Sequence, residues 1–140
     1  MKIYDFDEFG KSDEFGIGEP NDTYAEFFTG SSYLKPLNHD GIRLFNVTFE
    51  PGCRNNWHVH KAEKGGGQEL ICTAGEGWYQ ERDKEPMPLH PGMVIVIPPN
   101  VEHWHGAAVD SWFSHIAFDI PGTECETEWH EPVSDAEYPS

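Results

Sequence analysis

Basic residues are scarce in this sequence. Lys and Arg together number 9 against 25 Asp and Glu, which gives a formal net charge of -16 at pH 7. A surface this acidic repels the phosphates of nucleic acids and the head groups of anionic lipids. The composition therefore predicts no nucleic acid partner and no membrane partner.

Long apolar runs and a disulfide framework are missing too. No stretch approaches the ~20 apolar residues of a membrane-spanning helix, and the first residues lack the basic and then apolar segments of a secretory signal. The 3 cysteines, Cys53, Cys72 and Cys125, are odd in number and have no CxxC spacing. Free thiols in a reducing compartment fit this pattern, so we expect a cytoplasmic protein. Cys53 lies near several histidines and is an alternative soft metal ligand.

Glycine and proline, by contrast, are plentiful, at 14 and 11 residues. They separate short apolar runs with turn signals such as Pro51-Gly52 and Pro91-Gly92. Many short runs between Gly/Pro turns are typical of an all-β sandwich or barrel. The expected strands lie at 26–29, 42–50, 68–74, 77–80, 87–90, 93–97, 103–107 and 111–120.

The chain has room for one domain with one core. Residues 1–24 are acidic and weakly periodic, so they are predicted to form an N-terminal arm, and residues 25–140 the barrel domain. Near the end, Ser134 precedes Asp135, Ala136 and Glu137, a pattern that predicts a short capped helical turn.

Two His-x-His pairs, His58/His60 and His103/His105, indicate a metal site. On a strand, residues i and i+2 point to the same face, so each pair aims two imidazoles in one direction. Imidazole binds Mn, Fe, Co, Ni, Cu and Zn alike. Two such pairs on predicted strands favour a single shared ion.

The spacing around these pairs resembles the two motifs of the cupin superfamily, G-x5-HxH-x3,4-E-x6-G and G-x5-PxG-x2-H. The first matches from Gly52 through His58 and His60 to Gly75, and the second from Gly92 to His103. The resemblance implies a double-stranded β-helix, a jelly-roll-like barrel. Two departures are a longer loop after His60, with 7 residues, and an asparagine in place of the second motif's glycine.

The position of the acidic ligand in the first motif is filled differently. Counting back six residues from Gly75 selects Gln68, whereas Glu69 has the opposite strand parity and Glu63 falls in the loop. The predicted ligands are therefore His58, His60, Gln68 and His103, with Glu69 as the alternative to Gln68. Four neutral donors leave the full charge of a divalent ion uncompensated and positions open for substrate, as in catalytic sites.

Two further histidines are candidates for chemistry. The motif count selects His103 as ligand, so His105 points inward one step further along the strand. His115 also enters the cavity if it shares the inward face with Phe113, Ala117 and Asp119. For both, a hydrogen-bonded core histidine is the alternative interpretation.

A narrower resemblance is to the manganese-dependent hydroxynitrile lyases of bacteria and to cupins associated with carboxymuconolactone decarboxylases. It rests on segments such as VTFEPG (47–52), TAGEGW (73–78), HWHGAA (103–108) and EWHEPVSDAEY (128–138). The resemblance implies that His105 and His115 take part in the reaction. It also implies pocket positions for Phe45, Val47 and Asp119. Phe45 is bulky and Asp119 charged for such places, so the substrate stays open.

The resemblance implies a metal-dependent enzyme with lyase chemistry on a small oxygenated organic molecule. Manganese is the expected ion, with Fe, Zn, Ni, Co or Cu as alternatives. A metal-dependent oxygenase and a non-enzymatic small-ligand-binding cupin are the alternative functions. A homodimer is expected from sheet edges and the arm. Trp57, Trp104 and Trp112 have the parity opposite to the histidines, so they are expected outside the barrel, in positions open to a dimer interface.

Overall fold

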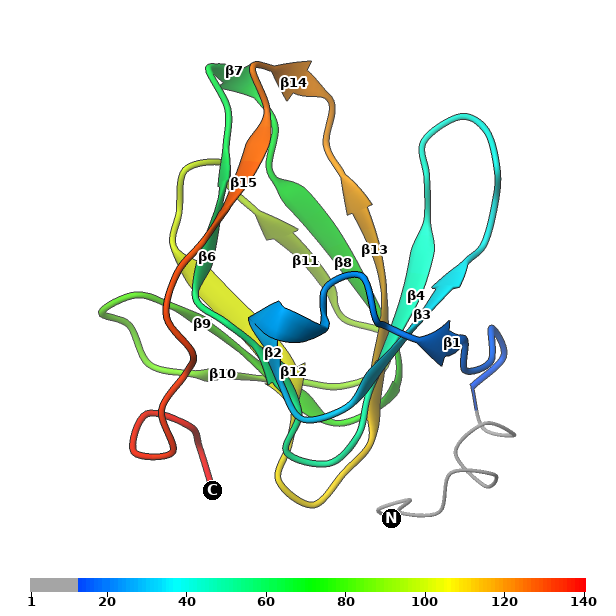
Figure 1. Ribbon diagram of the computed structural model, residues 1–140, viewed down its shortest axis with the longest axis vertical. Coiled ribbons are helices and arrows are strands. Elements are labelled where there is room, and N and C mark those ends of the chain that lie inside the picture. Colours follow the sequence, from blue (N-terminus) through cyan, green and yellow to red (C-terminus); the bar gives the residue numbers. More distant parts are fainter. Residues whose placement is uncertain (1–12) are drawn as a thin grey trace.

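A computed structural model describes residues 13–140, and nearly all regular structure in this part of the chain is β (Figure 1). The first main sheet has 6 antiparallel strands. Their order across the sheet is β1 (Glu19–Pro20), β3 (Ser32–Pro36), β4 (Phe45–Phe49), β13 (Phe113–Asp119), β8 (Gln68–Gly75) and β11 (Val94–Ile97).

The second main sheet has 7 strands and faces the first (Figure 1). It runs in the order β10 (Met87–Leu89), β9 (Gly77–Glu81), β12 (His103–Ala107), β5 (Arg54–Asn55) and β2 (Phe28–Thr29), with β6 (His58–Lys61) joining β12 to β15 (Glu126–Trp129). A separate ribbon pairs β7 (Lys64–Gly65) with β14 (Gly122–Thr123), and a short 3-10 helix, η1 (Ala25–Phe27), precedes β2.

The all-β prediction is confirmed, whereas closure into a barrel is not. The two main sheets remain separate in the described part of the chain. Among the longer strands, β3 and β15 lie outside the expected ranges, and so do the two-residue strands β1, β5, β7 and β14. Strand β6 is not among those ranges either, although its His-x-His pair was expected to lie on a strand. At the C-terminal end, residues 135–137 form a turn and no helix, although Ser134 and Glu137 make the reciprocal cap: the Glu137 N–H donates to Ser134 Oγ at 3.2 Å and the Ser134 N–H to Glu137 Oε1 at 3.0 Å. The domain boundary at residue 25 stays a prediction.

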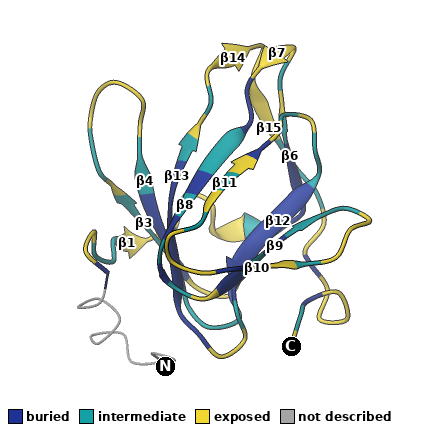
Figure 2. Ribbon diagram, turned by 180° about the vertical axis from the view of Figure 1, so that it is seen from behind, coloured by how far each residue is buried: buried dark blue, intermediate teal, exposed yellow. Residues whose placement is uncertain are grey.

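The main core lies between the two sheets. Along β8, Leu70, Cys72 and Ala74 are buried, while the residues between them are partly exposed, as a strand with one covered face requires. Strand β12 is buried along its whole length (Figure 2). Gly75 ends β8 with φ 71°, and a Cβ there would lie 1.8 Å from the Trp112 carbonyl oxygen. Only glycine allows this close approach of β8 to β13.

Three tryptophans, Trp57, Trp104 and Trp112, pack outside the two sheets, as their strand parity predicts, and other residues of the chain cover them. Trp57 and Trp104 are buried in a second apolar cluster with Val133 and Tyr138 from the C-terminal segment. Trp112 is buried against Tyr33 in a third. These three side chains are therefore not free for a dimer interface.

The C-terminal segment is anchored through Tyr138. Its ring packs on Trp104 with centroids 5.9 Å apart and lies 4.3 Å from the Arg54 guanidinium carbon, and its hydroxyl donates to the Ala107 carbonyl. We expect Tyr138→Ala to lower the free energy of unfolding by about 2–4 kcal/mol and Tyr138→Phe by about 1 kcal/mol. Urea unfolding measures both. A change within about 0.5 kcal/mol for Tyr138→Ala, as for an ordinary surface site, would contradict a docked C-terminal segment.

In the described residues, no helix is long and apolar enough to cross a bilayer. Cys53 and Cys72 are buried free thiols.

Candidate metal centre

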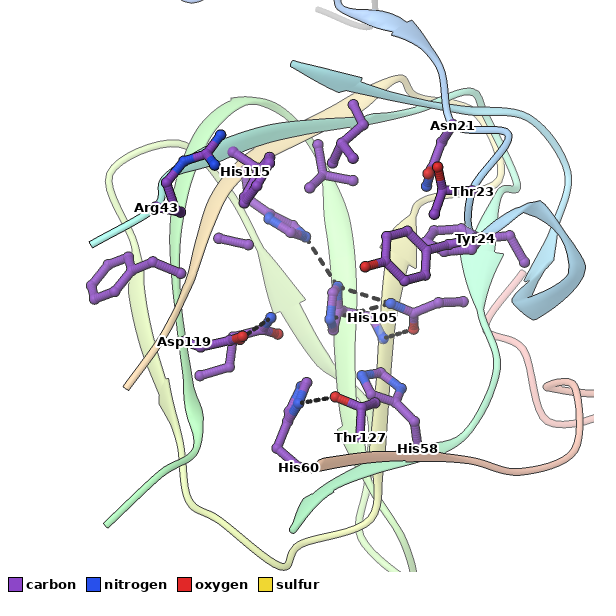
Figure 3. A pocket seen from close by; sticks show the side chains of 18 of the residues that line it. Asn21, Thr23, Tyr24, Arg43, His58, His60, His105, His115, Asp119 and Thr127 are labelled. Carbon is purple, nitrogen blue, oxygen red and sulfur yellow. Dashed lines mark hydrogen bonds between the residues drawn. The ribbon is translucent and has the colours of Figure 1, made fainter. Parts of the chain in front are cut away.

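A cavity of about 670 Å³ opens between the two sheets (Figure 3). Strand β6 contributes His58 and His60, and β13 contributes His115. The cavity is also lined by the three residues expected in a substrate pocket: Phe45, Val47 and Asp119.

The pairing of β6 with β12 brings the two His-x-His motifs side by side, because His58 lies directly opposite His103. The ring centroids of His58 and His103 are 4.2 Å apart, those of His58 and His60 5.1 Å, and those of His60 and His103 5.3 Å. Ligand atoms of His58, His103 and His105 all lie within 4.8 Å of one another. These three buried histidines are a group able to hold a metal ion, and His60 lies outside it.

Carbonyl groups fix the orientation of two of these rings. His58 Nδ1 donates to the Asn56 carbonyl at 2.8 Å, and His103 Nδ1 to the Val101 carbonyl at 2.9 Å. A carbonyl oxygen only accepts, so in the neutral rings the lone pair is left on Nε2. Such a bond to the far nitrogen is the usual support of a metal-binding histidine.

Three buried polar atoms beside this group have no hydrogen-bond partner among residues 13–140: His60 Nε2, Gln68 Oε1 and His103 Nε2. Gln68 Nε2 donates to Asp119 Oδ1 at 3.3 Å. Since a carboxylate only accepts, this bond turns the amide oxygen of Gln68 away from Asp119. Buried acceptors without partners are costly. The chemistry of these atoms, imidazole nitrogen and amide oxygen, would suit a transition metal.

Burial keeps the imidazoles neutral. It lowers the pKa of His103 to about 4 and that of His58 well below its usual range, with the neighbouring imidazoles adding to the effect. Burial also lowers the pKa of His60, against the opposing influence of Asp119 and Gln68. Lone pairs are therefore available for a metal at neutral pH.

His105 and His115 form a hydrogen-bonded pair deeper in the cavity, with His115 Nε2 and His105 Nδ1 3.0 Å apart (Figure 3). Asn55 Oδ1 accepts from the His105 backbone N–H at 2.9 Å. That bond places the amide nitrogen of Asn55 against the ring, 3.2 Å from Nε2 and 3.5 Å from Nδ1. Both ring nitrogens of His105 thus have partners within the protein, unlike Nε2 of His103.

The buried His115 makes the stability of the protein pH-dependent. Burial lowers its pKa to about 3 from a usual value of 6.5. Below pH 6.5 the unfolded chain therefore binds a proton that the folded chain does not. Stability from this residue is full above pH 6.5 and is lost, at about 1.4 kcal/mol per pH unit, as the pH falls towards 3. In chelator-treated protein, Asn at position 115 does not titrate, so the stability difference between wild type and His115→Asn is expected to shrink between pH 6 and pH 4. Urea unfolding at each pH measures it, and a constant difference would contradict the burial.

Several contributors to the site were not expected from the sequence. Asn55 and Thr127 line the cavity, and Thr127 Oγ1 lies 3.2 Å from His60 Nδ1. Thr127 belongs to β15, whose charged sequence does not predict a strand. Asn55 lies within the first motif, so its place in the sequence was a signal that could have pointed to it. Burial raises the pKa of the Cys53 thiol to about 12, which makes it a poor metal ligand, and Cys53 does not line the cavity.

The fold and this site define a class of protein: two antiparallel sheets that enclose a cavity with a buried histidine cluster. The model of the cupin domain family matches residues 45–112. The (R)-mandelonitrile lyase of Granulicella tundricola is 37% identical over 118 residues, which cover 81% of this chain and 87% of that protein. The chain belongs to the cupin family and resembles the hydroxynitrile lyases within it.

Solved structures agree with this assignment. A cupin-like protein of Thermotoga maritima is 41% identical, with a TM-score of 0.77 over 90% of this chain and 94% of that one. A DMSP lyase of Ruegeria pomeroyi, at 17% identity and a TM-score of 0.58 over 90% of this chain and 60% of that one, shares the fold.

Proposed function

We propose that this cupin is a metal-dependent lyase that acts on a small oxygenated organic molecule, in the manner of a hydroxynitrile lyase. The observation that carries the proposal is the set of buried acceptors without partners at His60, Gln68 and His103, beside the His105–His115 pair. The likeness to an (R)-mandelonitrile lyase supports the type of reaction.

The proposed ligands are His58, His60, Gln68 and His103. For His58 and His103 the support is the carbonyl bond at Nδ1, and for His60 and Gln68 it is the buried acceptor without a partner. His105 lies close enough to bind the same ion, but its nitrogens face Asn55 and His115. We therefore assign His105 to proton transfer and not to the metal.

A divalent cation bound there supplies a positive charge that polarises a hydroxyl or carbonyl oxygen and stabilises a developing alkoxide. The protein supplies the rest. A neutral His105 or His115 accepts the hydroxyl proton of a cyanohydrin, the C–C bond to cyanide breaks, and the same proton leaves with cyanide as HCN. Apolar walls that include Phe45 and Val47 hold the organic part and limit water.

The metal is proposed to be manganese. Fe, Zn, Ni, Co and Cu are alternatives, because a set of neutral nitrogen and amide donors does not discriminate strongly among these ions. A homodimer is also proposed, with the exposed edge strand β11, where Val94 and Val96 face solvent, as one surface open to a second copy. The buried free thiols of Cys53 and Cys72 favour the cytoplasm as the proposed location.

Cyanide-dependent addition to benzaldehyde tests the function. Manganese-loaded protein is expected to form mandelonitrile with an excess of one enantiomer, chelator-treated protein to lose this activity, and added Mn²⁺ to restore it. Chiral chromatography measures the product. Oxygen uptake with candidate substrates, in place of cyanohydrin formation, would indicate an oxygenase. Stoichiometric ligand binding without turnover would indicate a binding protein.

A further inference from the structure

One arginine of this chain stands apart from the other two. Arg54 pairs with Asp135, and Arg82 with Glu102 and Glu131. No carboxylate in residues 13–140 lies within ion-pair distance of Arg43, although the chain carries 25 acidic residues. Arg43 lines the same cavity as the histidines (Figure 3).

The guanidinium of Arg43 is held in place by its own loop. Asn38 donates from Nδ2 to the Ile42 carbonyl at 2.8 Å and accepts at Oδ1 from the Leu44 N–H at 2.9 Å, so it closes the loop. Its carbonyl accepts from Arg43 Nε at 2.9 Å, and the guanidinium carbon lies 5.2 Å from the centre of the Phe45 ring. Within residues 13–140, neither terminal nitrogen of Arg43 has a hydrogen-bond or ion-pair partner, so both are available to another group. A guanidinium fixed in this way is suited to bidentate binding of a carboxylate.

The positive charge of Arg43 favours binding of an anion beside its guanidinium group. Among the residues that the structure describes, Arg43 is the one lysine or arginine that lines the cavity. Among the described residues, Asp119 is the one carboxylate of the lining; it accepts a hydrogen bond from Gln68 Nε2 and keeps its negative charge.

The sheet register relates Arg43 to the metal centre. Phe45 at the start of β4 pairs with Ala117 on β13, and Asp119, two residues further along β13, pairs with Gln68 on β8. Arg43 precedes Phe45 by two residues, so the chain at Arg43 continues from β4 toward the end of the sheet that holds Asp119 and Gln68. Two inter-strand spacings amount to roughly 10 Å between the backbones. The cavity that Arg43 and Gln68 both line has a volume of about 670 Å³, which is enough for a small organic molecule.

We propose that Arg43 binds a carboxylate of the substrate, so that the natural substrate is a small organic acid whose hydroxyl or carbonyl end reaches the histidine cluster. This inference rests on the proposed function only in taking the cavity as the substrate site. It adds a substrate class, an anion, to a site whose lining, apart from Arg43 and Asp119, consists of apolar and polar uncharged side chains and histidines.

Equilibrium binding tests the inference without turnover. The probes are 4-(hydroxymethyl)benzoate and its near-isosteric neutral amide, 4-(hydroxymethyl)benzamide, titrated by calorimetry into metal-loaded protein. Wild type is expected to prefer the carboxylate by about tenfold, the size of one charge-assisted interaction near a surface. Arg43→Gln is expected to abolish the preference and Arg43→Lys to keep part of it. Lys84→Gln, which makes the same charge change at a residue that does not line the cavity, is expected to keep all of it.

Two results would overturn the inference. One is equal affinity for the two probes in wild type. The other is a preference that survives in Arg43→Gln, which would place the carboxylate on the metal. Thermal unfolding of each variant confirms that it is folded. Because no step of this assay involves cyanide, absence of cyanohydrin formation would count against the lyase proposal alone and leave the assignment of Arg43 intact.

Discussion

Replacing His103 by alanine is expected to abolish stoichiometric binding of a divalent metal. His103 is fully buried, its Nδ1 is fixed by the Val101 carbonyl, and its Nε2 is a lone pair without any partner. We expect the affinity for Mn²⁺ to fall by more than about 100-fold, because loss of a direct ligand exceeds the 10–100-fold cost of losing a supporting group. Competition with a chromophoric chelator measures the affinity.

His90→Ala is the matched control. His90 is exposed and lies outside the cavity, so this variant removes an imidazole and is expected to keep wild-type affinity. A second measurement is the stabilisation by metal: at 100 times the dissociation constant, a bound ion raises the free energy of unfolding by about 2.7 kcal/mol. His103→Ala is expected to lose this increment. One equivalent of tightly bound metal in His103→Ala would refute the assignment.

His105→Gln and His115→Gln are expected to slow the proposed reaction while leaving metal affinity unchanged. Positioned acid–base groups contribute about 10²–10⁴-fold in rate, so each variant should lose kcat within that range. Because the two rings are joined by one hydrogen bond of 3.0 Å, they are expected to act as a unit. The double variant should then be no slower than the slower single variant, since effects within a unit are not additive.

Steady-state kinetics of cyanohydrin cleavage, together with chelator competition, separates these expectations. Losses of rate that multiply in the double variant would show that the two histidines act independently. Unchanged kcat in both single variants would show that His105 and His115 are hydrogen-bonded core residues, which is the alternative interpretation. A loss of metal affinity in His105→Gln would instead identify His105 as a ligand, as its distance from His58 and His103 allows.

The sequence by itself determined the all-β class of the fold and the pairing of the histidines along their strands. Gly/Pro turns between short apolar runs predicted the all-β fold. The alternation of side chains along a strand predicted that His58 and His60 share one face, and that His103 and His105 do as well. Strand parity also placed Trp57 and Trp104 on the face away from the cavity, where the structure has them. These inferences depend only on residues close together in the chain, whose relative directions a strand fixes locally.

Only the tertiary structure decided which distant segments meet. The C-terminal segment covers Trp57 and Trp104 through Val133 and Tyr138. Strand β15 brings Thr127 to His60, and the loop that carries Arg43 lines the cavity. The pairing of His105 with His115, from different sheets, belongs here as well. Such contacts depend on sheet register and on the path of loops, which are set by the packing of the whole chain and not by the local alternation of side chains.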